Sequence, residues 1–315
     1  MKNKLLLIGA GNMGKEYSKV LTDMNVAFEV IGRGEATAAE FEKVTGKRPC
    51  TGGVEKYLNE TSEIPEYAIV AVDVTLLYST TVLLLERGVR KILVEKPAAL
   101  FSDEIMNLNA KANACNADVF VAYNRRFYES VRAAQRIIEE DGGVESFQFE
   151  FTEWSHRIEK IEKDRIEKER WFLSNSSHVA DMAFYLGGKP VSLSAYHSGS
   201  LSWHNAASCF TGAGVTENKA LFSYSANWAA PGRWGVELLT STHRLILRPL
   251  EKLQIQNKGT IDIEQYNIDE TLDTKYKPGL YRMVEAFLGR GNGSLCTVSE
   301  QAGIFRYYLE IANYR

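Results

Sequence analysis

A glycine-rich turn directly after the first apolar run limits this chain to few folds. The segment 7–14 reads Leu-Ile-Gly-Ala-Gly-Asn-Met-Gly, which is G-x-G-x-x-G between a predicted strand and a predicted helix. Gly9 would permit the tight turn, Gly11 would let the backbone approach a pyrophosphate, and Gly14 would let the helix pack on the strand. The free N–H groups of the helix N-terminus would face the anion. The turn therefore predicts a bound dinucleotide, and a turn that serves packing alone is the alternative.

Short apolar runs alternate with helical patterns from the N-terminus to residue 122. The runs are not alternately apolar and polar, which is typical of strands buried on both faces of a parallel sheet. The strands are expected at 4–9, 27–31, 67–72, 92–95 and 118–122, and the helices at 13–23, 36–45, 76–87 and 102–115. This order predicts a doubly wound Rossmann domain over residues 1–122, of class α/β.

The remaining chain has a different periodicity. Phe147, Phe149 and Phe151 lie on one face of a predicted strand at 144–152. A helix is expected before it at 128–140, and further strands at 191–198, 219–228, 234–241 and 244–248. We therefore predict an α+β domain over residues 123–315 for substrate binding and oligomerisation. Its large, mostly antiparallel, open-faced sheet has an aromatic face that helices or another subunit must cover.

Charge and hydropathy exclude several classes of protein. The 315 residues include 37 basic and 40 acidic side chains, a formal net charge of −3. This balance does not favour nucleic acid or an anionic membrane as a partner. No apolar run reaches the about 20 residues of a membrane span, and the run before Gly9 is too short for a signal peptide. The four cysteines have no metal-ligand spacing, so we expect a cytoplasmic protein with reduced thiols and no metal.

The end of the second predicted strand bears on the choice of cofactor. An acidic residue that binds the adenosine ribose is usual there, but residues 30–34 read Val-Ile-Gly-Arg-Gly. Glu29 and Glu35 flank the position without matching its register. Because a guanidinium can bind a 2′-phosphate that a carboxylate would repel, Arg33 beside Gly32 predicts NADP(H) in preference to NAD(H). Alternatively, Arg33 stacks on the adenine and either cofactor binds.

Three further segments carry a family resemblance. They are Val-Glu-Lys-Pro at 94–97, Ala-Tyr-Asn-Arg-Arg-Phe at 122–127, and a helix that opens with His-Val-Ala-Asp at 178–181. With the glycine turn, this ordered set resembles the glucose–fructose oxidoreductase / inositol dehydrogenase (Gfo/Idh/MocA) family over nearly the whole chain. The resemblance implies a two-domain, nicotinamide-dependent enzyme for sugars, cyclitols or nucleotide-linked sugars. It also implies a homodimer or homotetramer formed through the C-terminal sheet.

The resemblance implies roles for residues of these segments. Lys96 would sit at the nicotinamide end of the cofactor and contact the reacting oxygen, and a cis bond to Pro97 would aim it into the cleft. His178 matches the family's acid/base position. Hydride transfer to a carbonyl leaves an alkoxide that needs a positive donor and a proton, so the two residue types suit the reaction. Asp181, one turn further, could orient His178 or cap its helix.

Two groups of site residues complete the prediction. The residues expected at the cofactor are Gly9, Gly11, Asn12, Met13, Gly14, Gly32, Arg33, Asp73, Thr75, Glu95 and Lys96. Those expected at a sugar-like substrate are Tyr123, Arg126, Trp171, Ser174 and Asn175. For Tyr123 and Arg126, packing at the domain junction is the alternative.

The chain departs from the family pattern at two positions. Ser174 stands where the family often has an aspartate four residues before the histidine, and serine supplies no negative charge to an imidazolium. Tyr78 stands where a histidine is usual. Either His178 is less basic than usual, or Lys96 carries more of the proton transfer, or catalysis is weak.

Other features favour structural roles. The charged stretch 157–170 indicates a solvated helix with Glu159/Lys163 and Asp164/Lys168 pairs, and a basic rim for a phosphorylated substrate is the alternative. The sequence Thr-Val-Ser-Glu at 297–300 has the spacing of a capping box. We expect structural roles for His156, His197, His204 and His243, and core or interface positions for Trp203, Trp228 and Trp234, with a sugar platform as the alternative for the tryptophans.

Three functions fit these observations. The first is an oxidoreductase that transfers a hydride between NADP(H) or NAD(H) and a sugar-like alcohol or ketone. The second is a related enzyme whose tightly held cofactor oxidises a sugar transiently. The third is a cofactor-binding sensor or scaffold without catalysis, to which Ser174 and Tyr78 point.

Overall fold

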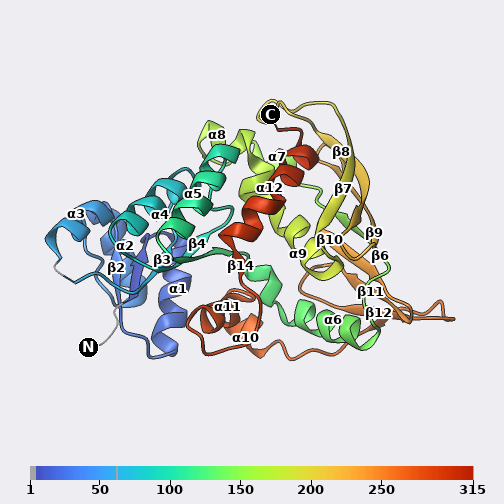
Figure 1. The fold of residues 1–315 in the computed structure, drawn as a ribbon, viewed down its shortest axis with the longest axis horizontal. Helices are drawn as coiled ribbons and strands as arrows, with labels where there is room; N and C mark the ends of the chain where they lie inside the picture. The colour runs from blue at the N-terminus through green and yellow to red at the C-terminus, as the bar shows by residue number, and fades with distance from the viewer. Residues whose placement is uncertain (1–4, 62, 315) are drawn as a thin grey trace. The chain divides into compact units, whose positions relative to one another are not determined.

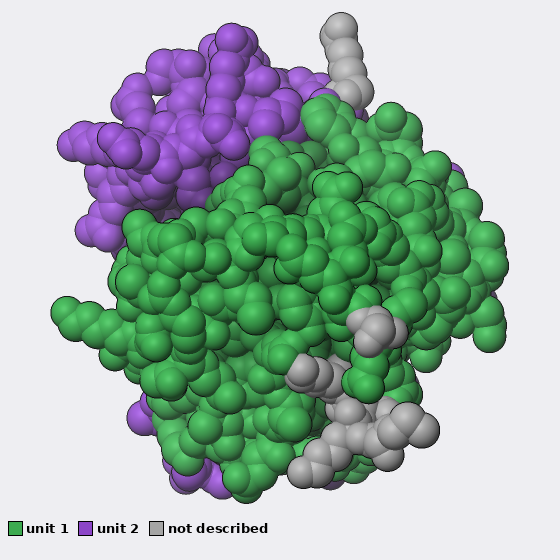
Figure 2. All heavy atoms as spheres, turned by 90° about the vertical axis from the view of Figure 1, so that its left-hand side faces the viewer, with its two compact units in different colours: residues 1–123, 275–303 green, residues 124–274, 304–315 purple. Residues whose placement is uncertain are grey.

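A computed structural model describes residues 5–61 and 63–314. The chain forms two compact units (Figure 2): unit 1 comprises residues 1–123 and 275–303, and unit 2 comprises residues 124–274 and 304–315. The first predicted strand, 4–9, begins at Leu5 within the described residues, and residue 4 lies outside them. Among the described residues, no helix has both the length and the apolar character to cross a membrane.

Unit 1 contains the parallel sheet that the sequence predicts. Its strands are β1 (Leu5–Ile8), β2 (Phe28–Ile31), β3 (Tyr67–Val70), β4 (Lys91–Glu95), β5 (Asp118–Ala122) and β14 (Cys296–Thr297). They lie in the order β14-β5-β4-β3-β1-β2, parallel except for the pair of β14 with β5. The order reverses between β1 and β3, which is the switch point where open α/β sheets bind ligands. The Rossmann prediction is confirmed.

Helices connect the strands of unit 1 (Figure 1). They are α1 (Asn12–Asp23), α2 (Glu35–Thr45), α3 (Gly53–Glu60), η1 (Val74–Leu76), α4 (Leu77–Glu86), α5 (Ser102–Ala114) and α11 (Leu280–Phe287). α1 packs against α2 and α11, and α4 packs against α5. Only α1, α2, α4 and α5 were predicted here, because the short α3 and α11 have too few turns for a periodic signal.

A late segment of the chain returns to unit 1. The ring of Phe287 meets Tyr67 and Phe120 edge-to-face, at centroid distances of 5.9 and 6.3 Å. The Tyr276 hydroxyl donates to Asp23 Oδ2 at 2.6 Å. The sequence analysis assigned everything after residue 122 to the second domain. That boundary lies beside the observed division at residue 123, but the return of 275–303 was not predicted, because a two-residue strand leaves no pattern in the sequence.

Unit 2 contains a larger sheet. Its strands are β6 (Ser146–Glu150), β7 (Pro190–Ser198), β8 (Cys209–Thr216), β9 (Leu221–Asn227), β10 (Gly235–Leu239), β11 (His243–Leu247), β12 (Gln254–Asn257) and β13 (Glu264–Gln265). They lie in the order β13-β12-β11-β10-β6-β9-β8-β7 and are antiparallel except for β6 and β9. The mostly antiparallel sheet is confirmed. β8 was missed because Gly212 and Gly214 interrupt its apolar alternation.

Unit 2 also contains helical segments, of which α9 and η3 contact the aromatic face of this sheet. They are η2 (Asn124–Phe127), α6 (Glu129–Glu140), α7 (Ser155–Ile158), α8 (Arg165–Glu169), η3 (Phe172–Ser176), α9 (Ser177–Gly187), most of α10 (Thr271–Lys275) and the end of α12 (Val298–Ala312). α9 packs on β6 and β10. Phe149 meets Phe184 of α9 at 5.5 Å, and Phe151 meets Phe172 of η3 at 5.1 Å. Helices of the same unit therefore cover these rings.

The charged stretch does not form the single helix expected. It contains the end of α7 and all of α8, with irregular chain between them. The observed ion pairs are Lys163–Glu167 at 3.1 Å and Arg165–Glu169 at 2.6 Å, so the predicted pairs have the wrong register.

The capping prediction at the start of α12 is confirmed, because the backbone N–H of Glu300 donates to Thr297 Oγ1 at 3.0 Å.

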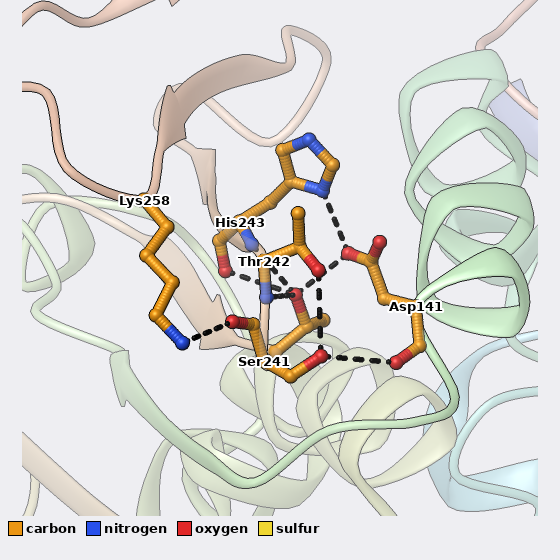
Figure 3. A network of polar contacts seen from close by, with 6 residues as sticks. Asp141, Ser241, Thr242, His243 and Lys258 are labelled. Atoms are coloured by element: carbon orange, nitrogen blue, oxygen red, sulfur yellow. Dashed lines mark hydrogen bonds and ion pairs between the residues drawn. The ribbon is translucent and has the colours of Figure 1, made fainter.

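A polar network joins the end of α6 to the turn between β10 and β11 (Figure 3). Asp141 Oδ2 accepts hydrogen bonds from Thr240 Oγ1 at 2.6 Å and lies 2.7 Å from His243 Nδ1. Ser241 Oγ donates to the carbonyl of Asp141 at 3.3 Å, and Lys258 Nζ donates to the carbonyl of Ser241 at 3.0 Å. His243 thus has the structural role expected for it. His204 also has one, since its ring nitrogens lie 2.8 Å from the Ala207 carbonyl and 2.9 Å from the Tyr314 hydroxyl.

Candidate functional site

The glycine turn in unit 1 has three distinct local geometries. Gly9 has φ +115°, and a Cβ there would lie 2.1 Å from the Ala71 carbonyl oxygen. A Cβ on Gly14 would lie 2.0 Å from the Gly9 carbonyl oxygen, whereas nothing described lies within 4 Å of a Cβ on Gly11. Backbone packing therefore requires Gly9 and Gly14, while the side of Gly11 is open.

The open side of Gly11 lies at the N-terminus of α1. Gly11 is the N-cap of that helix, Asn12 and Met13 are its first residues, and its first turn contains no acidic residue. The helix dipole and free N–H groups therefore favour an anion here, and no nearby carboxylate of the first turn opposes it. The turn fits the pyrophosphate of a dinucleotide.

Arg33 follows β2 and lies on the surface. Its Nη2 is 3.5 Å from Asp73 Oδ2, and the two side chains are 74% and 69% exposed. At this exposure the ion pair contributes little to the free energy of folding, so Arg33 can exchange Asp73 for another partner.

Glu35 accepts hydrogen bonds from Thr51 Oγ1, at 2.5 Å, and from Arg48. These contacts hold the pKa of Glu35 below its ordinary value and partly compensate its charge.

Lys96 follows β4 in a tight turn. The Lys96–Pro97 peptide bond is cis, as the sequence analysis anticipated. The buried side chain of Gln301, from α12, donates through Nε2 to the Pro97 carbonyl and to the Tyr123 hydroxyl, both at 3.2 Å. Gln301 therefore ties the turn after β4 to the end of β5. Sequence reasoning missed it because Gln301 lies outside every recognised motif.

Glu95, the last residue of β4, faces α1. Its Oε1 accepts a hydrogen bond from the Tyr17 hydroxyl at 2.7 Å. Burial raises the pKa of Glu95 above its ordinary value, although the Tyr17 hydrogen bond and the charge of Lys96 oppose this effect. The carboxyl of Glu95 is thus engaged with Tyr17, while its direct contact with a cofactor stays a prediction.

Predicted site residues of unit 1 gather at one edge of the sheet. Gly9, Arg33, Asp73, Lys96 and Tyr123 follow β1, β2, β3, β4 and β5, which run in parallel. The carboxyl ends of parallel strands share one edge, and ligands of doubly wound folds bind there. Thr75, in η1, is exposed beside Asp73. Tyr78 instead points to α5, where its hydroxyl donates to Asn107 Oδ1 at 3.0 Å.

A buried ion pair holds the start of α9 in unit 2. Arg126 donates through Nε and Nη2 to the two carboxylate oxygens of Asp181, at 2.8 and 2.6 Å. Both side chains are less than 5% exposed. Asp181 is the fifth residue of α9, so it does not cap the helix. His178 is buried one turn earlier on the helix that Arg126 holds, and the role of Asp181 in orienting His178 stays a prediction.

A π-helical turn, η3, precedes His178 directly. Ser174 Oγ donates to the carbonyls of Trp171 and Glu167, both at 3.3 Å. Turns of this kind occur frequently at functional sites. Ser174 therefore bonds to backbone and brings no charge. Trp171 is buried and meets the Trp203 ring edge-to-face at 6.0 Å.

A carboxyl from elsewhere in the sequence supports this turn. Glu153 Oε1 accepts hydrogen bonds from Asn175 Nδ2 at 2.8 Å and from Ser176 Oγ at 2.7 Å. Burial raises the pKa of Glu153, against the effect of these hydrogen bonds. The sequence analysis missed Glu153, although an acidic residue directly after the Phe147–Phe151 alternation is a signal that could have found it.

The three tryptophans expected in the core or at an interface, Trp203, Trp228 and Trp234, lie in buried positions. Trp203 and Trp228 stack with ring centroids 5.7 Å apart, and their Nε1 atoms donate to Ser155 Oγ and to the Phe151 carbonyl. Both belong to the core, as expected. Trp234 is also buried, and the guanidinium groups of Arg125 and Arg233 lie 4.8 and 4.6 Å from its ring centroid.

The sequence matches one described family. Residues 3–123 match the Gfo/Idh/MocA model, described as an oxidoreductase family with an NAD-binding Rossmann fold. A search of curated proteins gave no match.

Solved structures share the fold at low sequence identity. A levoglucosan dehydrogenase in complex with NADH and L-sorbose is 19% identical, with a TM-score of 0.81 over 99% of this chain and 96% of that one. A UDP-N-acetylglucosamine 3-dehydrogenase from Acidithiobacillus ferrooxidans is 14% identical, with a TM-score of 0.75 over 98% and 96%. The WlbA dehydrogenase from Chromobacterium violaceum, in complex with NADH and UDP-GlcNAcA, is 15% identical, with a TM-score of 0.74 over 98% and 92%.

The geometry of the glycine turn predicts that two similar substitutions affect different properties, cofactor affinity for Gly11 and folding stability for Gly14. Gly11→Ala places a methyl group in open space where a pyrophosphate would lie. It should weaken NADH binding at least tenfold, about 1.4 kcal/mol, and change the free energy of unfolding by about 1 kcal/mol or less. Gly14→Ala should lower that free energy by more than about 2 kcal/mol, because its methyl group meets backbone. Fluorescence titration and urea unfolding measure the two effects, and unchanged NADH affinity in Gly11→Ala would contradict the role of Gly11.

The burial of Glu153 predicts a pH-dependent stability. Its folded-state pKa is raised above the ordinary 4.5, so the folded protein binds more protons than the unfolded chain in the window above that value. This contribution to stability is present below pH 4.5 and is lost as the pH rises through the folded-state pKa. Glu153→Gln should therefore gain thermal stability relative to the wild type as the pH rises. Melting temperatures of both proteins from pH 4.5 to 8 test this, and a difference that moves the other way would exclude a raised pKa.

Proposed function

Because the N-terminal domain of this chain belongs to the Gfo/Idh/MocA oxidoreductase family, we propose that the protein is a nicotinamide-dependent oxidoreductase. It transfers a hydride between the cofactor and an alcohol or ketone carbon of a sugar-like substrate. The solved structures of similar fold include complexes of dehydrogenases with NADH and with sugars or sugar nucleotides, which supports this class of substrate.

One observation carries the proposal. The open side of Gly11, the exposed Asp73 and the turn of Lys96 follow neighbouring strands at the carboxyl edge of one parallel sheet. A dinucleotide bound across the switch point would meet all three. A nicotinamide bound there supplies the position that accepts or donates the hydride.

The side chains of this chain supply the remaining chemistry. The N-terminus of α1 holds the pyrophosphate, and Lys96 donates a hydrogen bond to the substrate oxygen as its charge grows. In the oxidation direction, the hydroxyl proton leaves as the hydride leaves carbon, and His178 receives it. Gln301 and the Arg126–Asp181 pair hold the segments that carry Lys96 and His178.

We further propose that the cofactor is NADP(H) rather than NAD(H). No acidic residue ends β2, Arg33 is exposed there, and Glu35 is already bound by Arg48 and Thr51. For Arg33 to bind a 2′-phosphate, its ion pair with Asp73 would have to break. We also propose a cytoplasmic homodimer or homotetramer, formed through the sheet of unit 2, which light scattering on the purified protein would test.

Replacement of Lys96 tests the proposed chemistry. Lys96→Ala should lower turnover of the best sugar substrate at least about a hundredfold, because one donor to the developing oxyanion is lost. Cofactor affinity should stay within about twofold of the wild type. Lys56→Ala, which removes an exposed lysine of the same unit, is the control and should change neither. Full activity of Lys96→Ala would overturn the assignment.

The wild-type protein separates the three functions. Net reduction of NADP⁺ by a sugar indicates the oxidoreductase. Product without a net change in nicotinamide absorbance, with cofactor that survives purification, indicates transient oxidation. Cofactor binding without turnover of any sugar indicates a sensor or scaffold.

Parallel titrations with NADPH and NADH test the cofactor preference. NADPH should bind at least tenfold more tightly, about 1.4 kcal/mol, and Arg33→Ala should abolish the difference. Lys275→Ala, which removes an exposed lysine paired with Asp23 at the C-terminal end of α1, should retain it. A preference for NADH in the wild type would remove Arg33 from the cofactor site while leaving the oxidoreductase proposal in place.

A further inference from the structure

Guanidinium groups and indole rings alternate within unit 2. Arg125 Cζ lies 4.8 Å from the Trp234 ring centroid, and Arg233 lies over the same ring at 4.6 Å. Arg233 also lies over Trp154 at 5.0 Å, and Arg157 lies over Trp154 at 4.4 Å. We call these five side chains the cation–aromatic ladder. It brings three positive charges into one small region.

Arg125 is at the inner end of the ladder. Its Nε is buried and has no hydrogen-bond partner among residues 5–61 and 63–314, and the same holds for Nε1 of the buried Trp234. Within that part of the chain Arg125 makes no ion pair, and its contacts are with the rings of Trp234 and Tyr128. Burial lowers the pKa of Arg125. Because an unpaired buried donor is costly, an acceptor beside these two N–H groups would be stabilised.

The nearest carboxyl group compensates the charge of the ladder only in part. Arg233 Nη1 lies 3.7 Å from Glu153 Oε2, while Asn175 and Ser176 donate hydrogen bonds to Oε1. The charge of Glu251 raises the pKa of Arg125, against the effect of burial. Burial inclines Glu153 toward its neutral form, which weakens its compensation of the guanidinium charge.

Residues of the ladder, or next to them in the sequence, also contact the segments that carry His178. Arg125 precedes Arg126, which binds Asp181 on α9, and Glu153 holds the turn directly before His178. The other end of the ladder is open, since Trp154, Arg157 and Arg233 are exposed. Trp154 Nε1 donates to the Gly232 carbonyl at 3.0 Å, which fixes the loop that carries Arg233. The outer end of the ladder is therefore accessible to a ligand from solvent.

We propose that the cation–aromatic ladder binds an oxyanion of the substrate, so that the substrate is a sugar acid or sugar phosphate rather than a neutral sugar. Planar guanidinium groups bind carboxylate and phosphate oxygens through paired, charge-assisted hydrogen bonds. The Nε of Arg125 and the Nε1 of Trp234 would donate to the same group. This inference rests on the proposed function and names the substrate class of that site.

Matched pairs of ligands test the inference on the full chain with saturating NADP⁺. Calorimetry compares D-glucose with D-glucuronate and with D-glucose 6-phosphate, and D-galactose with D-galacturonate. At least one anion should bind ten times more tightly than its neutral partner. The carboxylate and phosphate arms identify which oxyanion is preferred. Binding of the anion should weaken as salt is added, because salt screens charges.

Variants assign the effect to the ladder. Arg125→Gln and Arg233→Gln should each lose at least tenfold in affinity for the anion and less than twofold for the neutral sugar. Arg125→Lys, which keeps the charge but not the Nε donor, should recover only part of this loss. Arg165→Gln removes an exposed arginine of the same unit and is the control. If Arg125→Gln does not fold, Arg233→Gln at the exposed end still gives the test.

The outcomes separate this inference from the proposed function. Anion binding that is lost in the ladder variants, without turnover of any ligand, supports the anion site and overturns the oxidoreductase. Turnover of neutral sugars with unchanged kcat/KM in both glutamine variants supports the oxidoreductase and overturns the anion site. Equal affinity for the members of every pair also overturns the anion site, and a lower melting temperature alone in Arg125→Gln would leave the ladder a purely structural role.

Discussion

The close backbone contact between Gly9 and the end of β3 sets the shape of the sheet edge at which unit 1 would bind a ligand. The backbone N–H of Gly9 bonds to the carbonyl of Ile31, and that of Ala71 bonds to the carbonyl of Ile8, so the ends of β1, β2 and β3 are joined at this point. A side chain on Gly9 would collide with Ala71. Because the chain turns so sharply here, only three residues separate the end of β1 from the start of α1, with the first N–H groups of the helix at the carboxyl end of that strand.

In unit 2 a buried ion pair holds the helix α9, which carries His178. The Arg126–Asp181 pair is stable there because two parallel hydrogen bonds offset the cost of removing both charges from water. Glu153 does not have a comparable partner, since Arg233 stands 3.7 Å away. The first pair therefore fixes geometry, whereas the second region keeps unsatisfied polar groups. Such local conflict is typical of positions selected for function rather than stability.

The sequence was most informative where a short motif imposes a backbone geometry. The glycine turn, the capping box at Thr297 and the cis bond at Lys96–Pro97 could all be predicted, because each depends on neighbouring residues. Glu153 and Gln301 could not, since each acts on residues at least 20 positions away and no local pattern marks them. Ser174 shows the same limit: the sequence reveals the missing charge there, while only the fold shows that Glu153 bonds to the next two residues, Asn175 and Ser176.

The two-residue strand β14 has a consequence for the order of events during synthesis. β14 covers the open edge of β5, and unpaired strand edges readily pair with other chains. The residues of β14 leave the ribosome only after all the strands of unit 2. The edge of β5 in the nascent Rossmann sheet therefore stays uncovered while some 170 residues are synthesised. The β5 edge of the sheet is therefore covered only after the strands of unit 2 and β14 have been synthesised.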